Sequence, residues 1–204
     1  MITLAKLDEA DEIMKFIDNE WKKGHILAKN KSFFLYEYVN QDMLNFVISK
    51  DKGQINGILG FLRSATNNNA TVWTTMWKVS KLNGSPMLGI HLLNYLRAQG
   101  YKSVMSSGIN HTTEEIYKYL GFNVGKLNHY YIPNLRLDKY SIAKFPKFTV
   151  NNNFNDIKEK KLIFKKIKVE DLESSILFAN KSLEDPYKDF NYFKKRFFEH
   201  PIYS

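Results

Sequence analysis

The first two thirds of the chain alternate short runs of β-branched and aromatic residues with longer runs of helical periodicity. Strands are predicted at Leu44–Ser49, Gln54–Leu62 and Val72–Val79, because these runs are apolar and bounded by turn residues. The sequence Asp51-Lys52-Gly53 predicts a hairpin turn between the first two strands. Gly57 and Gly60 inside the second strand indicate a bulge or a close approach of another segment.

Apolar residues at helical spacing predict three helices, one before these strands and two after them. The first begins with Asp8 as its N-cap and ends at Gly24. The stretch 25–40 is a second short helix or a loop that lines a site. The remaining elements are helices at Leu88–Gln99 and Thr112–Leu120 and shorter strands at Ile2–Leu7, Ser103–Ser106 and Leu127–Ile132. This order predicts an α/β (α+β) fold, a mixed sheet with helices on both faces.

A change in composition near residue 136 predicts a domain boundary. Residues 1–135 are expected to form one domain. Residues 136–160 resemble a linker because of Pro146, three consecutive asparagines and a charged run. Residues 161–204 are expected to be a partial second copy of the strand–helix start, since Leu4, Lys6 and Asp11 match residues 160 positions later. The aromatic tail of that segment should pack on the first domain or on another chain, as in a homodimer.

Composition narrows the classes of function. The chain has no cysteine, which excludes disulfides and cysteine metal sites and fits a reducing compartment such as the cytoplasm. The formal charge of +9 is spread along the chain, so we expect a solvated surface that attracts small polyanions and no nucleic-acid partner. No signal peptide or apolar stretch of membrane-spanning length is recognised, and the histidines lack metal-ligand spacing.

Two motifs are chemically informative. The first runs from Val72 to Tyr95 as a strand, a glycine-containing loop and an amphipathic helix, an order that places a helix N-terminus where a phosphate group can bind. Val79 and Gly89 are ten residues apart within it. The second motif is Asn110, then Tyr117 seven residues later, then Gly121-Phe122. Each of these residues alone would more often be a helix cap or a packed aromatic. Their spacing and order as a set are what indicate a functional site.

Together these motifs resemble the GNAT N-acetyltransferases, over roughly residues 1–135. The resemblance implies a mostly antiparallel central sheet and acetyl-CoA as cosubstrate. The chain departs from the family pattern in its loop, where Gly84 stands at an Arg or Gln position, Met87 replaces a glycine and Pro86 lies between them.

The resemblance and the expected geometry give each motif residue a role. The edge of the strand would pair with the pantetheine arm, the loop N–H groups would bind the pyrophosphate, and Tyr117 would protonate the departing thiolate as general acid. The expected cofactor-binding residues are Trp77, Lys78, Val79, Gly84, Ser85, Met87, Leu88, Gly89, Ile90 and Asn110. Glu20, Glu37, His25 and His111 remain open as candidates for the general base.

The acceptor is expected to be the primary amine of a small molecule. Tyr36, Glu37, Trp73 and Thr75 are the expected substrate-binding residues, in an aromatic and polar pattern that suits a sugar-like ligand or an ordinary core. The sequence also resembles bacterial GNAT proteins of surface-polysaccharide synthesis, which implies an amino sugar or sugar nucleotide. Two alternatives stay open: a tandem-GNAT aminoacyl transferase of the Fem type, and a non-catalytic GNAT-like binding module.

Overall fold

A computed structural model describes residues 1–65, 70–82, 84–128, 140–141, 166–174 and 188–202. The chain divides into two compact units, one formed by Met1–Ile109 with Ile167–Ser204 and the other by Asn110–Lys166. No helix among the described residues has the length and apolar character needed to cross a membrane.

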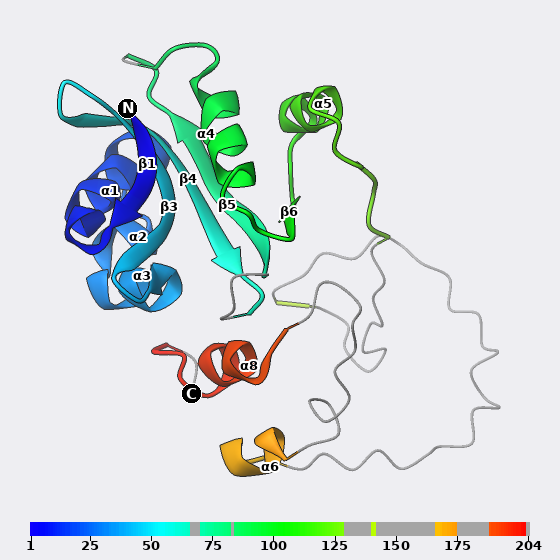
Figure 1. The fold of residues 1–204 in the computed structure, drawn as a ribbon. Coiled ribbons are helices and arrows are strands. Elements are labelled where there is room, and N and C mark those ends of the chain that lie inside the picture. The colour runs from blue at the N-terminus through cyan, green and yellow to red at the C-terminus, as the bar shows by residue number, and fades with distance from the viewer. Residues whose placement is uncertain (66–69, 83, 129–139, 142–165, 175–187, 203–204) are drawn as a thin grey trace. The chain divides into compact units, whose positions relative to one another are not determined.

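The first unit is built on a sheet of six strands within the described residues (Figure 1). Its main path runs β1-β3-β4-β5-β6, and the two-residue β2 pairs with β3. All pairs are antiparallel except β5 with β6, so the predicted mixed, mostly antiparallel sheet is confirmed. The strands are β1 (Ile2–Lys6), β2 (Val39–Asn40), β3 (Met43–Asp51), β4 (Gln54–Arg63), β5 (Thr71–Val79) and β6 (Ser103–Ser106).

The β3–β4 hairpin forms as its sequence predicts. Lys52 and Gly53 both have positive φ, 47° and 80°, which lie in the left-handed region that a two-residue hairpin turn requires. Gly60 lies at a register shift where Thr75 and Met76 of β5 oppose one residue of β4. A Cβ on Gly60 would lie 2.6 Å from Thr75 Oγ1, so the predicted bulge with close approach is confirmed.

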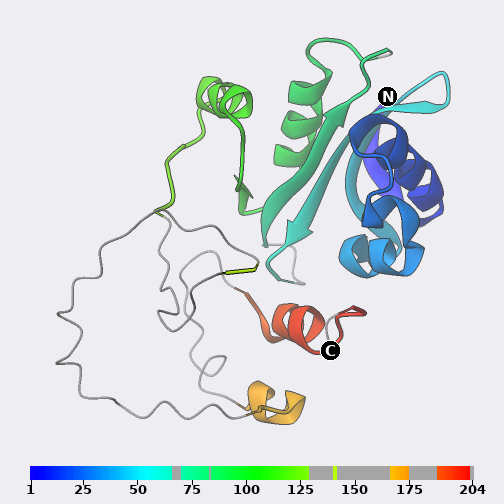
Figure 2. The ribbon, with the colours of Figure 1, turned by 180° about the vertical axis from the view of Figure 1, so that it is seen from behind.

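One face of the sheet is covered by the N-terminal helices (Figures 1 and 2). They are η1 (Leu7–Glu9), α1 (Ala10–Phe16), the π-helical turn η2 (Ile17–Trp21), α2 (Ile26–Lys29) and α3 (Lys31–Tyr38). The prediction that Asp8 is the N-cap is wrong. The Glu9 carboxylate accepts the Lys6 N–H at 2.7 Å, which stabilises a 3-10 turn before α1 begins at Ala10. The helical region ends at Trp21, three residues before the predicted end, and Gly24, at φ 73°, lies in the turn that follows.

The opposite face is covered by α4 (Leu88–Arg97), which begins and ends close to its predicted bounds. Leu92, Leu93 and Leu96 are all 0% exposed. Gly57 makes the close contact possible, because a Cβ there would lie 3.1 Å from side-chain carbons of both Leu88 and Leu92. Gly100, at φ 79°, follows the helix.

The second unit contains α5 (His111–Tyr119), which Gly121 follows at φ 79° as predicted. The expected strand at Leu127–Ile132 begins with Leu127 and Asn128, which are not in regular structure, and continues outside the described residues. The predicted linker also lies almost wholly outside them.

The C-terminal part of the first unit contains α6 (Val169–Glu173) and α8 (Phe190–Phe197). At α6 the Lys168 N–H donates to Asp171 at 3.4 Å, which reproduces the Lys6–Glu9 turn of the N-terminus. The two turns are related by 162 positions, two more than the shift that we inferred from the sequence. The proposed second copy stays a prediction, since its expected strand lies mainly outside the described residues.

Candidate functional site

Within the part of the chain that the structure describes, β6 pairs with only half of strand β5. β6 pairs in parallel with Thr71 to Thr74 only, whereas the β4 side remains paired as far as Val79. Among the described residues no strand pairs with Thr75–Val79 on the β6 side. The backbone of Trp77, Lys78 and Val79 therefore offers N–H and carbonyl groups to an extended ligand along this edge.

The loop after β5 is held by hydrogen bonds around Ser80. Its N–H donates to Asn56 O at 2.8 Å, and its carbonyl accepts the Gly84 N–H at 3.1 Å. The Ser80 hydroxyl donates to Glu20 Oε1 at 3.3 Å, which ties the loop to η2. Gly84 is required here: a Cβ would lie 2.1 Å from Val79 Cγ1 and 2.4 Å from the Ser80 carbonyl oxygen. The loop therefore needs glycine at the position where the GNAT pattern has Arg or Gln.

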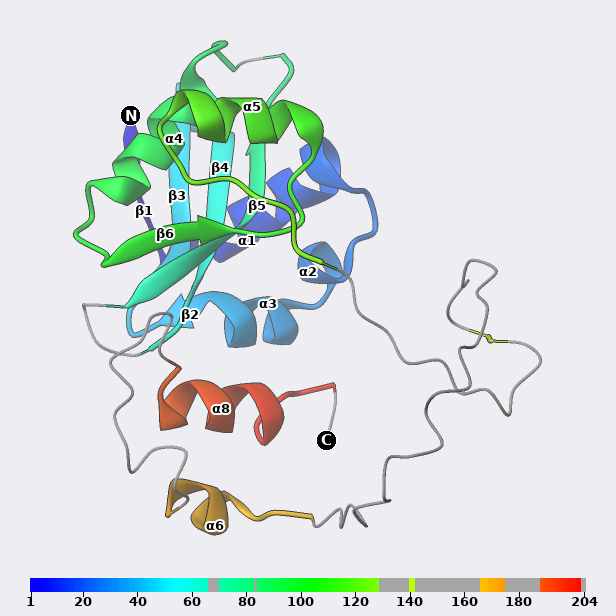
Figure 3. The ribbon, with the colours of Figure 1, turned by 90° about the vertical axis from the view of Figure 1, so that its right-hand side faces the viewer.

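The N-terminus of α4 follows this loop directly (Figure 3). The Leu88 N–H donates to Ser85 O at 3.1 Å, so the turn already uses one of the expected donors. The N–H groups of Gly89 and Ile90 lie in the first helical turn, where the helix supplies no acceptor. Met87 is 49% exposed, so its side chain extends toward solvent. Trp77 Nε1 donates to Gly89 O at 3.1 Å and fixes this turn to β5.

Asn110 and Tyr117 lie in the second unit. Asn110 Oδ1 accepts the Thr113 N–H at 2.9 Å, so the side chain serves as the N-cap of α5. Tyr117 is 3% exposed, and its ring packs edge-on against Phe122 at 4.7 Å between centroids. The predicted roles of both residues toward CoA remain predictions.

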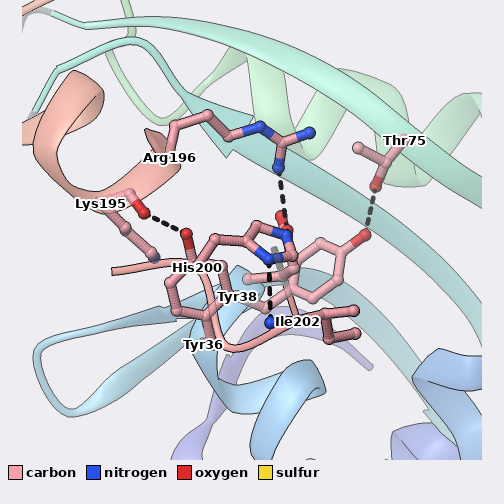
Figure 4. A network of polar contacts seen from close by, with 8 residues as sticks. Tyr36, Tyr38, Thr75, Lys195, Arg196, His200 and Ile202 are labelled. Atoms are coloured by element: carbon pink, nitrogen blue, oxygen red, sulfur yellow. Dashed lines mark hydrogen bonds and ion pairs between the residues drawn. The ribbon is translucent and has the colours of Figure 1, made fainter. Parts of the chain in front are cut away.

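A polar network joins α3 to the C-terminal segment 188–202 within the first unit (Figure 4). The Tyr36 hydroxyl donates to the Lys195 carbonyl, and Arg196 Nη1 pairs with Glu37 Oε1 at 2.9 Å. His200 is buried, and its ring lies 5.2 Å from that of Tyr36. Two of the expected substrate-binding residues, Tyr36 and Glu37, therefore contact residues of the C-terminal segment that are 159 positions away in the sequence.

The other two expected residues lie along β5. Thr75 is exposed at the bulge, and its hydroxyl is 3.2 Å from the hydroxyl of Tyr38 (Figure 4). Burial raises the pKa of Tyr38 to about 12, so this phenol stays neutral near pH 7, and either hydroxyl of the pair can act as the donor. The Trp73 ring is 5.8 Å from Lys188 Nζ.

A cavity of about 290 Å³ lies beside this network. Tyr36 and Glu37 line it, whereas Trp73 and Thr75 do not. Its other wall comes from α8, which sequence reasoning did not assign to any site. The only sequence signal was the aromatic character of the tail, which predicted packing but not a ligand site.

Three of the four candidates for the general base have structural partners. Glu20 accepts from Ser80, and Glu37 pairs with Arg196. His25 Nδ1 accepts the Leu27 N–H at 3.3 Å as the cap of α2, and burial, together with Lys22, lowers the pKa of this imidazole. His111 is exposed at the start of α5.

No protein-family model matches the chain, and no curated protein matches it in sequence. Solved structures with a partly similar fold include a possible acetyltransferase from Clostridium difficile 630 (17% identity, TM-score 0.48, 65% of this chain and 96% of that one). An aminoglycoside acetyltransferase from an uncultured soil metagenomic sample has 12% identity and a TM-score of 0.49, over 65% of this chain and 97% of its own.

A third similar structure, AAC(6')-Iy in complex with a bisubstrate analogue of CoA, has 14% identity and a TM-score of 0.48, over 65% of this chain and 97% of its own.

Proposed function

We propose that the chain is an N-acetyltransferase that moves an acetyl group from acetyl-CoA directly to the primary amine of a small acceptor. The observation that carries the proposal is the half of β5 that no described strand pairs on the β6 side, which leads through the Gly84 loop into the N-terminus of α4. An extended ligand with amides along its length and a pyrophosphate at one end suits this arrangement. CoA has both features.

The pyrophosphate would bind the Gly89 and Ile90 N–H groups at the positive end of the α4 dipole. The pantetheine arm would pair with Trp77–Val79 and bring the thioester toward the bulge at Thr75, about 13 Å along the strand at ~3.3 Å per residue. Bulges re-aim backbone groups next to active sites, and N–H donors there would stabilise the developing oxyanion.

In the transfer the amine nitrogen attacks the thioester carbonyl carbon. A C–N bond forms, the C–S bond breaks, and the CoA thiolate takes a proton, for which Tyr117 is the proposed donor. The ammonium proton of the product passes to a base or to water. The proposal assigns no base, and Glu20 is better suited to positioning the loop through Ser80.

Titration of the full chain with CoA and acetyl-CoA, followed by calorimetry and by thiol release with amine acceptors, tests the proposal. We expect both nucleotides to bind, and we expect Tyr117→Phe to slow transfer while CoA affinity stays within about two-fold. Absence of CoA binding would overturn the proposal. Binding of CoA without turnover on any amine would favour the non-catalytic module instead.

A further inference from the structure

The cavity beside α3 lies at the other end of the sheet from the α4 loop. Leu62 and Arg63 of β4 line it, and these residues pair with Trp73 and Val72 at the start of β5. Val79, which leads into the loop, is six residues beyond Trp73, or ~20 Å along an extended strand. A cofactor arm that begins at the loop and runs along β5 would therefore point its reactive end toward the cavity.

Among the described residues, the two carboxylates that line the cavity leave one lysine of the lining without an ion pair. Both carboxylates of the lining are engaged: Glu37 pairs with Arg196, and Asp189 Oδ1 accepts the Tyr192 N–H at 2.7 Å as the N-cap of α8. Lys195 also lines the cavity, and among the described residues no carboxylate forms an ion pair with its ammonium. Its Nζ instead lies 5.2 Å from the centre of the Tyr36 ring.

Burial of that ammonium has a free-energy cost. Desolvation lowers the pKa of Lys195, and the more distant carboxylates of Glu37 and Glu199 offset this only in part. An anionic group placed in the cavity would stabilise the charged form. A compact lysine ammonium binds phosphate as a point charge, and Arg63 adds a second cation to the lining.

The rest of the lining suits a hydroxylated ring. Tyr36 and Tyr192 supply aromatic surfaces, and four side-chain amides supply donors and acceptors for hydroxyl groups (Asn40, Asn45, Gln41 and Asn191). Gln41, at a positive φ of 57°, begins the two-residue turn between β2 and β3, which places its side chain at the rim of the cavity.

We propose that this cavity is the acceptor site and that it binds an amino sugar carrying a phosphate, with Lys195 of α8 binding the phosphate. The assignment of the ligand as acceptor depends on the proposed acetyl transfer. The C-terminal segment would then be part of the specificity site of the domain, since α8 supplies one wall of the cavity and its principal anion-binding group.

Calorimetry on the full chain without CoA tests the site with three probes: glucosamine 6-phosphate, glucosamine and glucose 6-phosphate. We expect glucosamine 6-phosphate to bind at least ten-fold more tightly than glucosamine. Lys195→Gln should weaken binding of both phosphorylated probes by at least ten-fold and leave glucosamine unaffected, because only the phosphate contacts the ammonium. Lys195→Arg, which keeps the charge, should recover most of the affinity.

Lys194→Gln is the matched control, because Lys194 precedes Lys195 on α8, pairs with Glu199 at 3.3 Å and does not line the cavity. Its affinities should equal those of the unmodified chain, and melting curves of all variants confirm folding. Equal affinity for glucosamine and glucosamine 6-phosphate, or unchanged binding in a folded Lys195→Gln variant, would overturn the inference. A separate CoA titration distinguishes the proposals: loss of CoA binding alone would overturn acetyl transfer, and loss of sugar-phosphate binding alone would overturn the acceptor site.

Discussion

Helices α4 and α8 belong to the same unit but are attached to it by different forces. α4 buries four leucines against the sheet, whereas α8 has no buried residue and contacts α3 through hydrogen bonds and an ion pair. α4 begins at the proposed cofactor loop, and α8 lines the proposed acceptor cavity. The cofactor end is therefore built on apolar packing, and the acceptor end on polar contacts that are individually weak.

This difference predicts how the two ends respond to change. Apolar packing makes a large contribution to the free energy of unfolding, and partly exposed ion pairs make a small one. We expect α4 to open only when the unit unfolds and α8 to open locally, at lower free energy.

The largest effect is expected for Leu92→Ala. Leu92 lies on the buried face of α4 and is 0% exposed, so its truncation removes apolar burial and leaves a cavity. We expect a loss of about 2–5 kcal/mol in the free energy of unfolding, measured by urea titration. Leu82→Ala is the control: Leu82 is 88% exposed, and its truncation should change that free energy by less than about 0.5 kcal/mol. A small effect of Leu92→Ala would show that α4 is not held by its apolar face.

Gly84→Val should affect the cofactor end specifically. The new side chain would overlap Val79 and the Ser80 carbonyl, so the loop would have to change conformation. We expect CoA affinity to fall by more than ten-fold, about 1.4 kcal/mol, in calorimetry. Gly125→Ala serves as control, since nothing lies within 4 Å of a Cβ there. Unchanged CoA affinity in a folded Gly84→Val variant would show that the conformation of this loop does not determine CoA binding.

Arg196→Met should loosen α8 without unfolding the sheet. The change removes the 2.9 Å pair with Glu37, whose side chain is only 13% exposed. We expect amide exchange of α8 to accelerate about two- to five-fold, equivalent to roughly 0.5–1 kcal/mol, with α4 unchanged. Lys194→Met removes only the pair with Glu199 and should have a smaller effect. Equal acceleration in α4 and α8 would mean that the two helices open together.

The smallest effect concerns an ion-pair cluster around the base of the β3–β4 hairpin. Lys50 Nζ lies 2.9 Å from Glu9 Oε1 and also pairs with Glu12. Burial alone would raise the pKa of Glu9, but hydrogen bonds from Lys50 and the Lys6 N–H outweigh it and lower the pKa. A carboxylate with a lowered folded pKa stabilises the fold above its unfolded pKa, near 4.5, and this contribution is lost as pH falls through the folded pKa.

Glu9→Gln should therefore cost about 0.5 kcal/mol near pH 7, and its cost should shrink below pH 4.5 in urea titrations. Glu115→Gln, which removes an exposed pair with Lys118, is the control and should change less. A cost for Glu9→Gln that stays constant with pH would contradict the ion-pair origin.

The cofactor end was more predictable from the sequence than the acceptor end. The strand, the loop and α4 are consecutive in the chain, so periodicity and the Val79–Gly89 spacing located them. Close approach at Gly57 and Gly60 and the turn at Lys52-Gly53 could also be predicted from the sequence, because each depends on the backbone conformation or missing side chain of the residue itself. Asp8 was misassigned because the Glu9 side chain competes for the Lys6 N–H and forms a 3-10 turn first.

The acceptor cavity could not be located in this way. Its walls come from α3 and α8, whose residues are about 159 positions apart where Tyr36 contacts Lys195. No periodic pattern links two segments at that separation, and their contacts depend on where the folded chain brings them. Thr75 was expected at the substrate site as part of the aromatic and polar pattern, but its partner, Tyr38, became evident only from the fold.

Hydrogen exchange of the unmodified chain with and without CoA tests the central claim most directly, because it reports where the nucleotide binds. We predict slower exchange for the amides of Trp77–Val79 and of Gly89 and Ile90, with α8 unchanged. Protection confined to α8, or no protection at β5 and α4 under saturating CoA, would contradict the assignment of the β5 edge and the α4 N-terminus as the cofactor site.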